Sequence, residues 1–545
     1  MLLFVAGFVA NVVCCQPPGS PPRPPIPGAL KTAPAPRPIP DASDKLFAGE
    51  TISKLKIVIT QAELQKLRDD NRAYVRCNVI ENGTVTYKDV AVKLKGAAGS
   101  FREIDDRPAL TLNMDRFAAG QSFHDLEKLH LNNSVQDESY LNELLCAELF
   151  RDAGLPAPRV THARVWLNGR DLGLYVLKEG FDKRFLKRHF ANATGNLYEG
   201  GFVQDIDADL QKDSGKDPED RTDLQALRDA CAEPDPATRW KRLAACVDID
   251  KFIDFMALEL LTCHWDGYSL NKNNYRLYFD PQTRRAHFLA HGMDQMFGDP
   301  AASVIDYPSA MVSSAVMLNP AWRKKYRMRL KQLLPLFDPP TRLQQRADAV
   351  ARRLRPVLKA ISEDQATAFN DRVAEVKQRL LDRAASLREQ VELPEPGPIE
   401  FNDERFADLP DWYAASESED ALHEELELPG PRLAYSIKCG PSGVCVASWR
   451  RKVLLDRGRY QLLAQAKTDN LAPQSDEKGS GVGLRISGAN RTNTFPGTSN
   501  WKPLDFEFEV VEELREVELV AEIRATAGQV WFARDSLRLK RLSQK

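Results

Sequence analysis

Residues 264–280 read HWDGYSLNKNNYRLYFD, and this stretch joins an apolar helical run to a strand. The run before it, FIDFMALELLTCHW, has apolar residues at helical spacing, and YRLYF after it is typical of a strand. Between them stand Asp266, a glycine and three asparagines, which are common turn residues. A plain turn is one interpretation. The other is a site in which an acid orients a hydroxyl and an asparagine side chain holds a metal.

Strand patterns dominate residues 50–200. KLKIVIT, YVRCNVI and VTYKDVAVKLKG alternate apolar and polar residues, and Asn82-Gly83 between the last two predicts a hairpin. ALTLNMDRF (109–117) predicts another strand, and Asn168-Gly169 predicts a second hairpin. From Ser139 the spacing predicts a helix that ends at Gly154. Residues 50–200 are therefore expected to be α+β.

The rest of the chain divides by composition. Residues 222–395 have helical patterns, and 203–222 is polar and acidic like an exposed insertion. Residues 401–430 form an acidic linker in this interpretation. Short strands between turns from 431 to 545 predict an all-β sandwich. RGRYQLLAQAKT and GQVWFARDSLRL there resemble jelly-roll modules that bind carbohydrate, with Trp501 as a candidate sugar platform, although such an aromatic is also typical of a core.

The N-terminus suggests export. Leu2–Cys15 is apolar but too short to span a bilayer, and it leads into a proline-rich segment. We interpret 1–16 as a signal or lipoprotein-like segment, with Cys14 or Cys15 as the lipid-anchored residue, and 17–48 as a linker. No Lys or Arg precedes the apolar run, so a disordered apolar tail is the alternative. The expected location is the cell surface or periplasm.

Charge and cysteines exclude some classes of function. The 75 basic and 77 acidic residues are nearly balanced, so nucleic acid is not an expected partner. Cys439 and Cys445 bracket a tight loop that a disulfide could close, and Cys231 with Cys246 is a weaker pair. Neither pair has the spacing of a zinc site. Cys77, Cys146 and Cys263 are expected in the core.

Six segments occur in an order that resembles the spore coat protein H (CotH) family of atypical protein kinases. They are LKGAAGS, RPALTLNMD, LHLNNSVQDESYLNELLCAELFRDAGLPAPR, VWLNGRDLGLYVLKEGFDKRFL, HWDGY with NNYRLYFD, and HFLAHGMDQMFG. The resemblance implies a two-lobed, kinase-like α+β domain over residues 49–400, followed by the jelly-roll-like sandwich. It also implies ATP and Mg²⁺ as cofactors, and a Ser/Thr-containing extracytoplasmic protein as the phosphate acceptor.

Phosphoryl transfer requires donors and cations around the phosphates. Gly96, Gly99 and Ser100 form a small-residue loop that could approach phosphate, with Lys95 beside it; a hairpin turn explains the glycines equally well. Arg107 stands where the family usually has its phosphate-pairing lysine. The remaining candidates are two glutamates. Glu143 would pair with the cation, or is an exposed helical residue. Glu179 would contact nucleotide or cation, while Lys178 beside it fits a solvent-facing lysine.

The chemistry also requires an acid near the acceptor and oxygen ligands for Mg²⁺. The resemblance assigns Asp266 to the catalytic role and Asp294 to metal binding. The asparagine ligand is Asn271 by kinase spacing or Asn274 by the following strand, and we favour Asn274. Many relatives carry a second acid where this chain has Gly292. Asp137 is interpreted as a helix cap.

Two other functions remain open at this stage. One is a degenerate kinase that acts as a surface-binding protein, with the sandwich holding a glycan or matrix ligand. The other is a different nucleotide-dependent transfer on the same fold, such as AMPylation.

Overall fold

The computed structural model describes residues 41–542, apart from 50, 98, 307, 396, 429–431, 476–478 and 492–494. The apolar N-terminal stretch and most of the proline-rich segment lie outside the described residues. The predicted linker ends earlier than expected, because α1 (Ser43–Ala48) is helical. In the described part of the chain, no helix combines the length and the apolar character needed to cross a membrane.

A closed seven-stranded barrel forms the N-terminal part, in the order β1-β2-β3-β4-β5-β7-β6. Its interior is apolar because alternate residues of each strand point inward, as the buried-exposed alternation of β1 shows. Both expected hairpins are present, β2–β3 and β6–β7. The strands are β1 (Ser53–Val58), β2 (Val75–Glu81), β3 (Val85–Lys95), β4 (Ala109–Asn113), β5 (Lys128–Asn132), β6 (Val160–Leu167) and β7 (Arg170–Glu179).

The segment between β1 and β2 differs from the expectation of strands over 51–100. It forms α2 (Gln61–Asp69), which begins at Thr60, whose hydroxyl accepts a hydrogen bond from Glu63 N at 3.3 Å. Leu64 and Leu67, three residues apart, bury one face of this helix. The helix is too short to produce a strong periodic pattern, which explains why the sequence did not reveal it.

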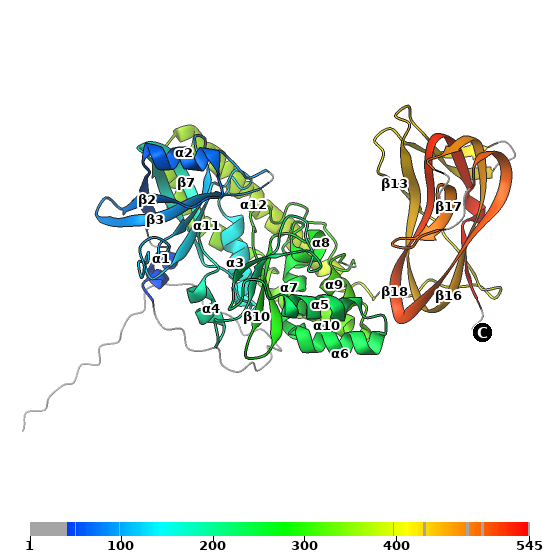
Figure 1. Ribbon diagram of the computed structural model, residues 1–545, viewed down its shortest axis with the longest axis horizontal. Coiled ribbons are helices and arrows are strands. Elements are labelled where there is room, and N and C mark those ends of the chain that lie inside the picture. Colours follow the sequence, from blue (N-terminus) through cyan, green and yellow to red (C-terminus); the bar gives the residue numbers. More distant parts are fainter. Residues whose placement is uncertain are drawn as a thin grey trace, which may run out of the picture.

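Helices and a second sheet follow the barrel in the middle of the molecule (Figure 1). The sheet has the order β11-β10-β8-β9, so β9, within the predicted insertion, is an edge strand. Its strands are β8 (Leu197–Glu199), β9 (Gln211–Ser214), β10 (Tyr275–Asp280) and β11 (Arg285–Ala290). The helices up to β10 are α3 (Asn142–Asp152), α4 (Lys183–His189), α5 (Thr222–Ala232), α6 (Pro236–Cys246), α7 (Ile249–Leu261) and α8 (Tyr268–Asn271). After β11 come α9 (Met311–Met317), α10 (Pro320–Leu333), the 3-10 turn η1 (Leu334–Leu336), α11 (Thr341–Lys359) and α12 (Glu363–Gln390).

Helix α11 returns to the barrel and holds α3 in place. Arg346 forms a salt bridge with Glu148 of α3 at 2.6 Å, and Arg342 pairs with Asp152 at its end. Arg353 donates to His162 of β6 at 3.0 Å. The orientation of α3 therefore depends on contacts with a helix about two hundred residues later in the chain.

The C-terminal region is all-β and has its own hydrophobic core (Figure 1). It begins earlier than expected, because three strands occupy the predicted acidic linker: β12 pairs with β19, β13 with β16 and β14 with β15. β14 is an edge strand, where charged side chains face solvent, so its acidic composition resembled a linker. The elements are β12 (Phe406–Asp408), β13 (Tyr413–Ser416), β14 (Leu422–Leu428), β15 (Arg432–Lys438), β16 (Cys445–Pro473), β17 (Gly481–Ile486), β18 (Gly497–Ala533), η2 (Arg534–Ser536) and β19 (Arg538–Arg541).

One buried ion pair joins this region to the helices. Arg239 of α6 donates to Glu512 of β18 at 3.2 Å, and both side chains are buried. Trp501 is partly buried, and the Arg432 guanidinium lies 4.4 Å from its ring centroid.

The cysteines of the described residues are free thiols, so neither expected pair is a disulfide here. Cys439 and Cys445 are hydrogen-bonded neighbours at the predicted loop. Cys77, Cys146 and Cys263 are buried, as expected.

Candidate functional site

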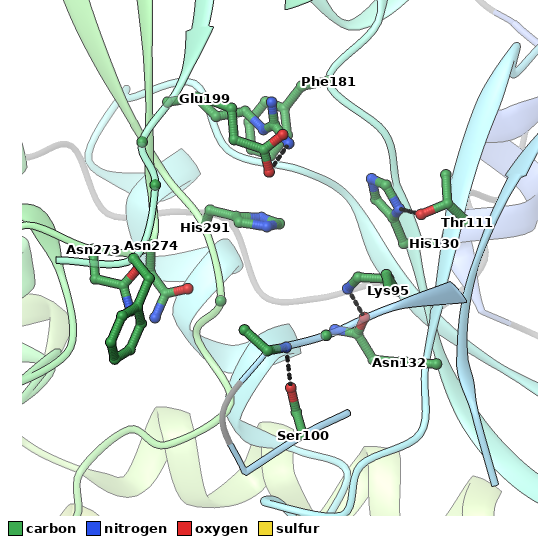
Figure 2. Close-up of a pocket in the computed structure, with 18 of the residues that line it drawn as sticks. Lys95, Ser100, Thr111, His130, Asn132, Phe181, Glu199, Asn273, Asn274 and His291 are labelled. Atoms are coloured by element: carbon green, nitrogen blue, oxygen red, sulfur yellow. Dashed lines mark hydrogen bonds and ion pairs between the residues drawn. The ribbon is translucent and has the colours of Figure 1, made fainter. Parts of the chain in front are cut away.

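A cavity of about 820 Å³ opens between the barrel and the segments that follow β8 and α7. One wall comes from strands β3, β4 and β5, and the facing wall carries the Asp266 turn and the segment after β11 (Figure 2). From the predicted site, the cavity lining includes Lys95, Gly96, Ser100, Asp266, Asn274 and Asp294.

The barrel wall of the cavity is polar because of the strand register. Lys93 pairs with Thr111, Thr111 with His130, and His130 with Lys178 across four strands. Residues that pair across a sheet point to the same face, so these polar side chains form one row outside the apolar barrel interior. Such a wall suits a strongly polar or anionic ligand.

The partly buried Lys95 and the buried Lys178 are connected through Asn132 and Glu143. Lys95 donates to Asn132 Oδ1, and Asn132 Nδ2 donates to Glu143 Oε2 at 2.8 Å. Lys178 donates to the other oxygen of Glu143, and its Nζ lies 3.2 Å from His291 Nδ1. Glu143 is therefore buried and paired with a cation, and it is not an exposed helical residue.

Burial lowers the pKa of Lys95 to about 8, and the nearby Lys178 ammonium acts in the same direction. Burial disfavours the charged form of Glu143, but the Lys178 ammonium holds the pKa of this carboxyl below its ordinary value. Burial raises the pKa of Asp294, and the Glu143 carboxylate adds to this effect. Two cations and two acids are thus in close electrostatic contact here: Lys95 and Asp294 line the cavity, and Lys178 and Glu143 lie behind them.

The loop after β3 is a tight turn that exposes backbone to the cavity. Ser100 Oγ accepts a hydrogen bond from Ala97 N at 3.3 Å. Gly96 has φ +98°, and a Cβ there would lie 3.0 Å from Ser100 Oγ, so this position favours glycine. Asn133 Nδ2 donates to Ser100 O at 3.1 Å and to Arg107 O at 2.8 Å, which connects both ends of the loop.

The asparagines after Asp266 hold its carboxylate. Asn271 Nδ2 donates to Asp266 Oδ1 at 2.6 Å, and Asn274 Nδ2 donates to Oδ2 at 2.7 Å. Asn273 Nδ2 lies 3.1 Å from both oxygens. Three amides therefore fix the orientation of one acid. Residues 264–280 are therefore both a turn and a segment that positions the Asp266 carboxylate.

Buried contacts in turn fix this loop. The Glu259 carboxylate accepts hydrogen bonds from Tyr268 N at 2.8 Å and Ser269 N at 3.0 Å. A Cβ at Gly267 would lie 2.4 Å from Glu259 Oε1, so only glycine fits between Asp266 and Tyr268. The Tyr268 hydroxyl donates to Asp205 Oδ1 at 2.9 Å.

Gly292 lies directly against Asn274. It has φ +58°, and a Cβ there would lie 2.3 Å from Asn274 Oδ1. The carboxamide of Asn274 thus fills the space that a side chain at 292 would need. His291 N donates to Asn274 O at 2.9 Å and keeps the two segments together.

The oxygen atoms here fit a magnesium ion that also binds phosphate. Asn274 uses its amide nitrogen on Asp266, which leaves Oδ1 as an oxygen ligand. Within the described residues, no side chain donates a hydrogen bond to the Asp294 carboxylate. The backbone carbonyl of Asp294 accepts a hydrogen bond from Asn142 Nδ2 at 2.8 Å. Mg²⁺ prefers one or two such ligands together with phosphate oxygens and water. No group of three or more His, Cys, Asp and Glu side chains suited to a metal occurs in the part of the chain described.

Several predicted residues lie outside this cavity lining. Arg107 donates to Tyr140 Oη at 3.1 Å and Leu174 O at 2.6 Å, so it braces the barrel, and the cation that pairs with Glu143 is Lys178. Glu179 is buried between Arg159, at 3.1 Å, and Arg188. Gly99 and Glu143 also lie outside the lining, although Glu143 supports it through Asn132.

The sequence pattern did not identify Lys178 as the partner of Glu143, and the expectation that Lys178 faces solvent was wrong. It is fully buried. A lysine within the apolar strand LYVLKE was the available signal, because a buried lysine needs a partner. Asp137 behaves as predicted: its carboxylate accepts from Asn142 N at 2.9 Å at the start of α3.

The comparisons with known proteins agree with the motifs. The family model described as CotH kinase protein matches residues 92–389. The inner spore coat protein H of Bacillus subtilis (strain 168) is 24% identical over 265 residues, which cover 44% of this chain and 71% of that protein. Invasin CotH7 of Rhizopus delemar is 26% identical over 181 residues, 31% of this chain and 30% of its own length.

The all-β region has only weak structural likenesses. A structure of TmCBM61 in complex with beta-1,4-galactotriose is 12% identical, covering 25% of this chain and 91% of that chain, with a TM-score of 0.18. A likeness this low carries no argument about ligands.

Proposed function

The chain belongs to the CotH kinase family, and from this premise we propose that it is an exported protein kinase that transfers the γ-phosphate of ATP to Ser or Thr of an extracytoplasmic protein, with Mg²⁺. In this proposal the barrel and the helical region are the two lobes of a kinase-like domain. The observation that carries it is the meeting of Asp266, Asn274, Asp294 and Lys95 at one cavity.

Each side chain then has a physical task. Asp294 and Asn274 would hold Mg²⁺, which neutralises phosphate charge. Lys95 and the 96–100 loop would contact phosphate oxygens from the barrel side. Asp266 would orient the acceptor hydroxyl, which would replace one of the two 3.1 Å contacts that Asn273 Nδ2 makes with its carboxylate. Glu143 pairs with Lys178 and holds Asn132, and so positions Lys95.

The surface location and the second module are part of the same proposal. The relatives include a spore coat protein and fungal invasins, which supports a surface or exported protein. The all-β region would be a jelly-roll-like sandwich that binds glycan or matrix. Arg432 covers one face of the partly buried Trp501 ring, so Trp501 offers at most one open face for a sugar.

One observation favours a second candidate, a degenerate kinase that only binds. Gly292 removes an acid that many relatives have, and Asn274 fills the space beside it. A protein with one metal-binding carboxylate could hold nucleotide weakly, or not at all, and act as a surface-binding protein.

Thermal unfolding of the full chain with ATP, with and without Mg²⁺, separates the two candidates. A ligand that binds only the folded state raises stability, by about 2.7 kcal/mol at a hundredfold excess over Kd. We expect Mg²⁺-dependent stabilisation. If millimolar ATP does not change the melting temperature, only the surface-binding function remains.

Labelled ATP then tests the chemistry. Asp266→Ala and Asp294→Ala should each lower incorporation by roughly 10²- to 10⁴-fold. Asp229→Ala, an exposed acid on α5, should leave it unchanged. Product mass distinguishes phosphate transfer from AMPylation, because an adenylate adds far more mass.

A further inference from the structure

Three cations line the outer part of the cavity wall without an acid partner. Lys93 lies on β3, Arg116 follows β4 and Lys128 begins β5. None of the three forms an ion pair within the described residues. Tyr74 lies between two of them, with its ring centroid 4.9 Å from Lys93 Nζ and 4.6 Å from the Arg116 guanidinium carbon.

The acids nearby form their ion pairs with other cations. Glu199 and Asp213 influence Lys93, but both carboxylates pair with Arg276, Glu199 at 2.8 Å. Asp209, which also lines the cavity, is exposed and lies 3.8 Å from Arg221. Burial is the main cause that lowers the pKa of Lys93; attraction to Glu199 opposes this effect, and repulsion from Lys128 adds to it. In the described part of the chain, the three cations therefore form no direct ion pair, although Glu199 and Asp213 act on Lys93 at longer range.

The cluster begins at Lys93, two residues before Lys95 on the same face of β3, and extends away from the inner cations. Lys95 pairs with Ala109 at one end of β4, whereas Lys128 pairs with Asn113 at the other end. Four residues along a strand span about 13 Å. The loop at 96–100 follows Lys95, and Lys95 is linked to Lys178 through Asn132 and Glu143, so the triphosphate would have its own cations there.

We propose that Lys93, Arg116 and Lys128 form a second anion site in this cavity, and that it receives the carboxylates or phosphates of an acidic acceptor peptide. This inference rests on the proposed function and specifies its substrate class. Arg116 is exposed and Lys93 and Lys128 are partly exposed, so a side chain of a bound peptide can reach them while the acceptor hydroxyl lies at Asp266. A basic acceptor would be repelled by the same three charges.

Direct binding tests the site without nucleotide. The probe is a fluorescein-labelled peptide with one serine flanked by glutamates, and matched peptides carry glutamine or lysine instead. Fluorescence anisotropy with the full chain should show binding of the glutamate peptide alone, weakening with added salt. Lys93→Gln/Lys128→Gln should weaken it at least about tenfold.

A matched variant controls for charge and folding. Lys54→Gln/Lys56→Gln removes the same charge from exposed positions of β1, outside the cavity lining, and should leave peptide binding unchanged. Equal melting temperatures of both double variants would show that the cavity pair still folds. Peptide phosphorylation should show the same loss as a rise in acceptor KM, with the KM for ATP changed less than about twofold.

Two outcomes overturn the inference. If the glutamate peptide binds no better than the glutamine peptide, the cations do not select acidic acceptors. If Lys93→Gln/Lys128→Gln weakens ATP binding and leaves peptide binding unchanged, the site holds nucleotide phosphates. Failure of the proposed function is separate, since it appears as absent Mg²⁺-ATP stabilisation in the unmodified chain.

Discussion

Replacing Gly292 with alanine should disrupt the metal-binding corner of the cavity. Gly292 has φ +58°, where an alanine costs about 1–2 kcal/mol. The new Cβ would lie 2.3 Å from Asn274 Oδ1 and 2.6 Å from Cγ, so the carboxamide must move. Movement breaks its 2.7 Å hydrogen bond to Asp266, and a hydrogen bond to a charged group contributes about 1.5–3 kcal/mol. The total is about 2.5–5 kcal/mol.

Gly83→Ala is the matched control for this change. Gly83 has φ +76° in the β2–β3 hairpin, and a Cβ there meets nothing within 4 Å. It should cost only the backbone term of about 1–2 kcal/mol. Differential scanning fluorimetry should therefore show a larger drop in melting temperature for Gly292→Ala, and calorimetry should show at least about tenfold weaker Mg²⁺-ATP binding only for that variant.

Equal melting temperatures and equal nucleotide affinities for the two variants would refute this reasoning. Gly292→Asp, which restores the acid of many relatives, extends the test. Because Asn274 fills the space, this variant should lose affinity for Mg²⁺-ATP. Tighter binding by Gly292→Asp would show that the corner can hold a second acid.

Three further predictions concern buried charges. Burial raises the pKa of Glu259 from 4.5 to about 7, so between these pH values the folded protein keeps a proton that the unfolded chain loses. The free energy of unfolding should therefore fall by about 3 kcal/mol as pH rises through this window. Glu259→Gln should remove this pH dependence from thermal unfolding curves. An identical slope in both proteins would contradict it. Because burial lowers the pKa of Lys95 to about 8, Mg²⁺-ATP affinity measured by calorimetry should fall above pH 8. Lys95→Met should bind Mg²⁺-ATP weakly at pH 7, and its affinity should not fall further above pH 8. Wild-type affinity in this variant would exclude a contact between Lys95 and phosphate. Arg239→Ala leaves Glu512 buried without this partner and should lower the free energy of unfolding in denaturant by about 3 kcal/mol. Arg239→Ala/Glu512→Gln should recover part of this loss. Additive losses would show that the two side chains are not coupled.

Local patterns in the sequence were sufficient for much of the framework. The hairpins at Asn82-Gly83 and Asn168-Gly169 and the helix α3 depend on residues close together in the chain. The family resemblance was confirmed by the match over residues 92–389. Its motifs also pointed to Asp266, Asn274 and Asp294, which line one cavity.

Other features could not be read from local patterns. Strand β14 looked like a linker because an edge strand with charged side chains has the composition of a solvated loop. Arg107 was expected to be the phosphate-pairing cation and Lys178 to face solvent, but their roles depend on which face of the barrel each occupies. That face is set by the register of strands that are far apart in sequence.

Residue types and their short-range spacing thus established the family, the hairpins and the identity of the acids. Barrel closure and the packing of α11 on α3 established that Lys178 pairs with Glu143, that Arg107 lies outside the cavity lining, and that the Asp266 turn and the loop after β3 line one cavity. The physical reason is that hairpins and helices arise from neighbouring residues, whereas a charged side chain acquires its partner only when distant segments pack together.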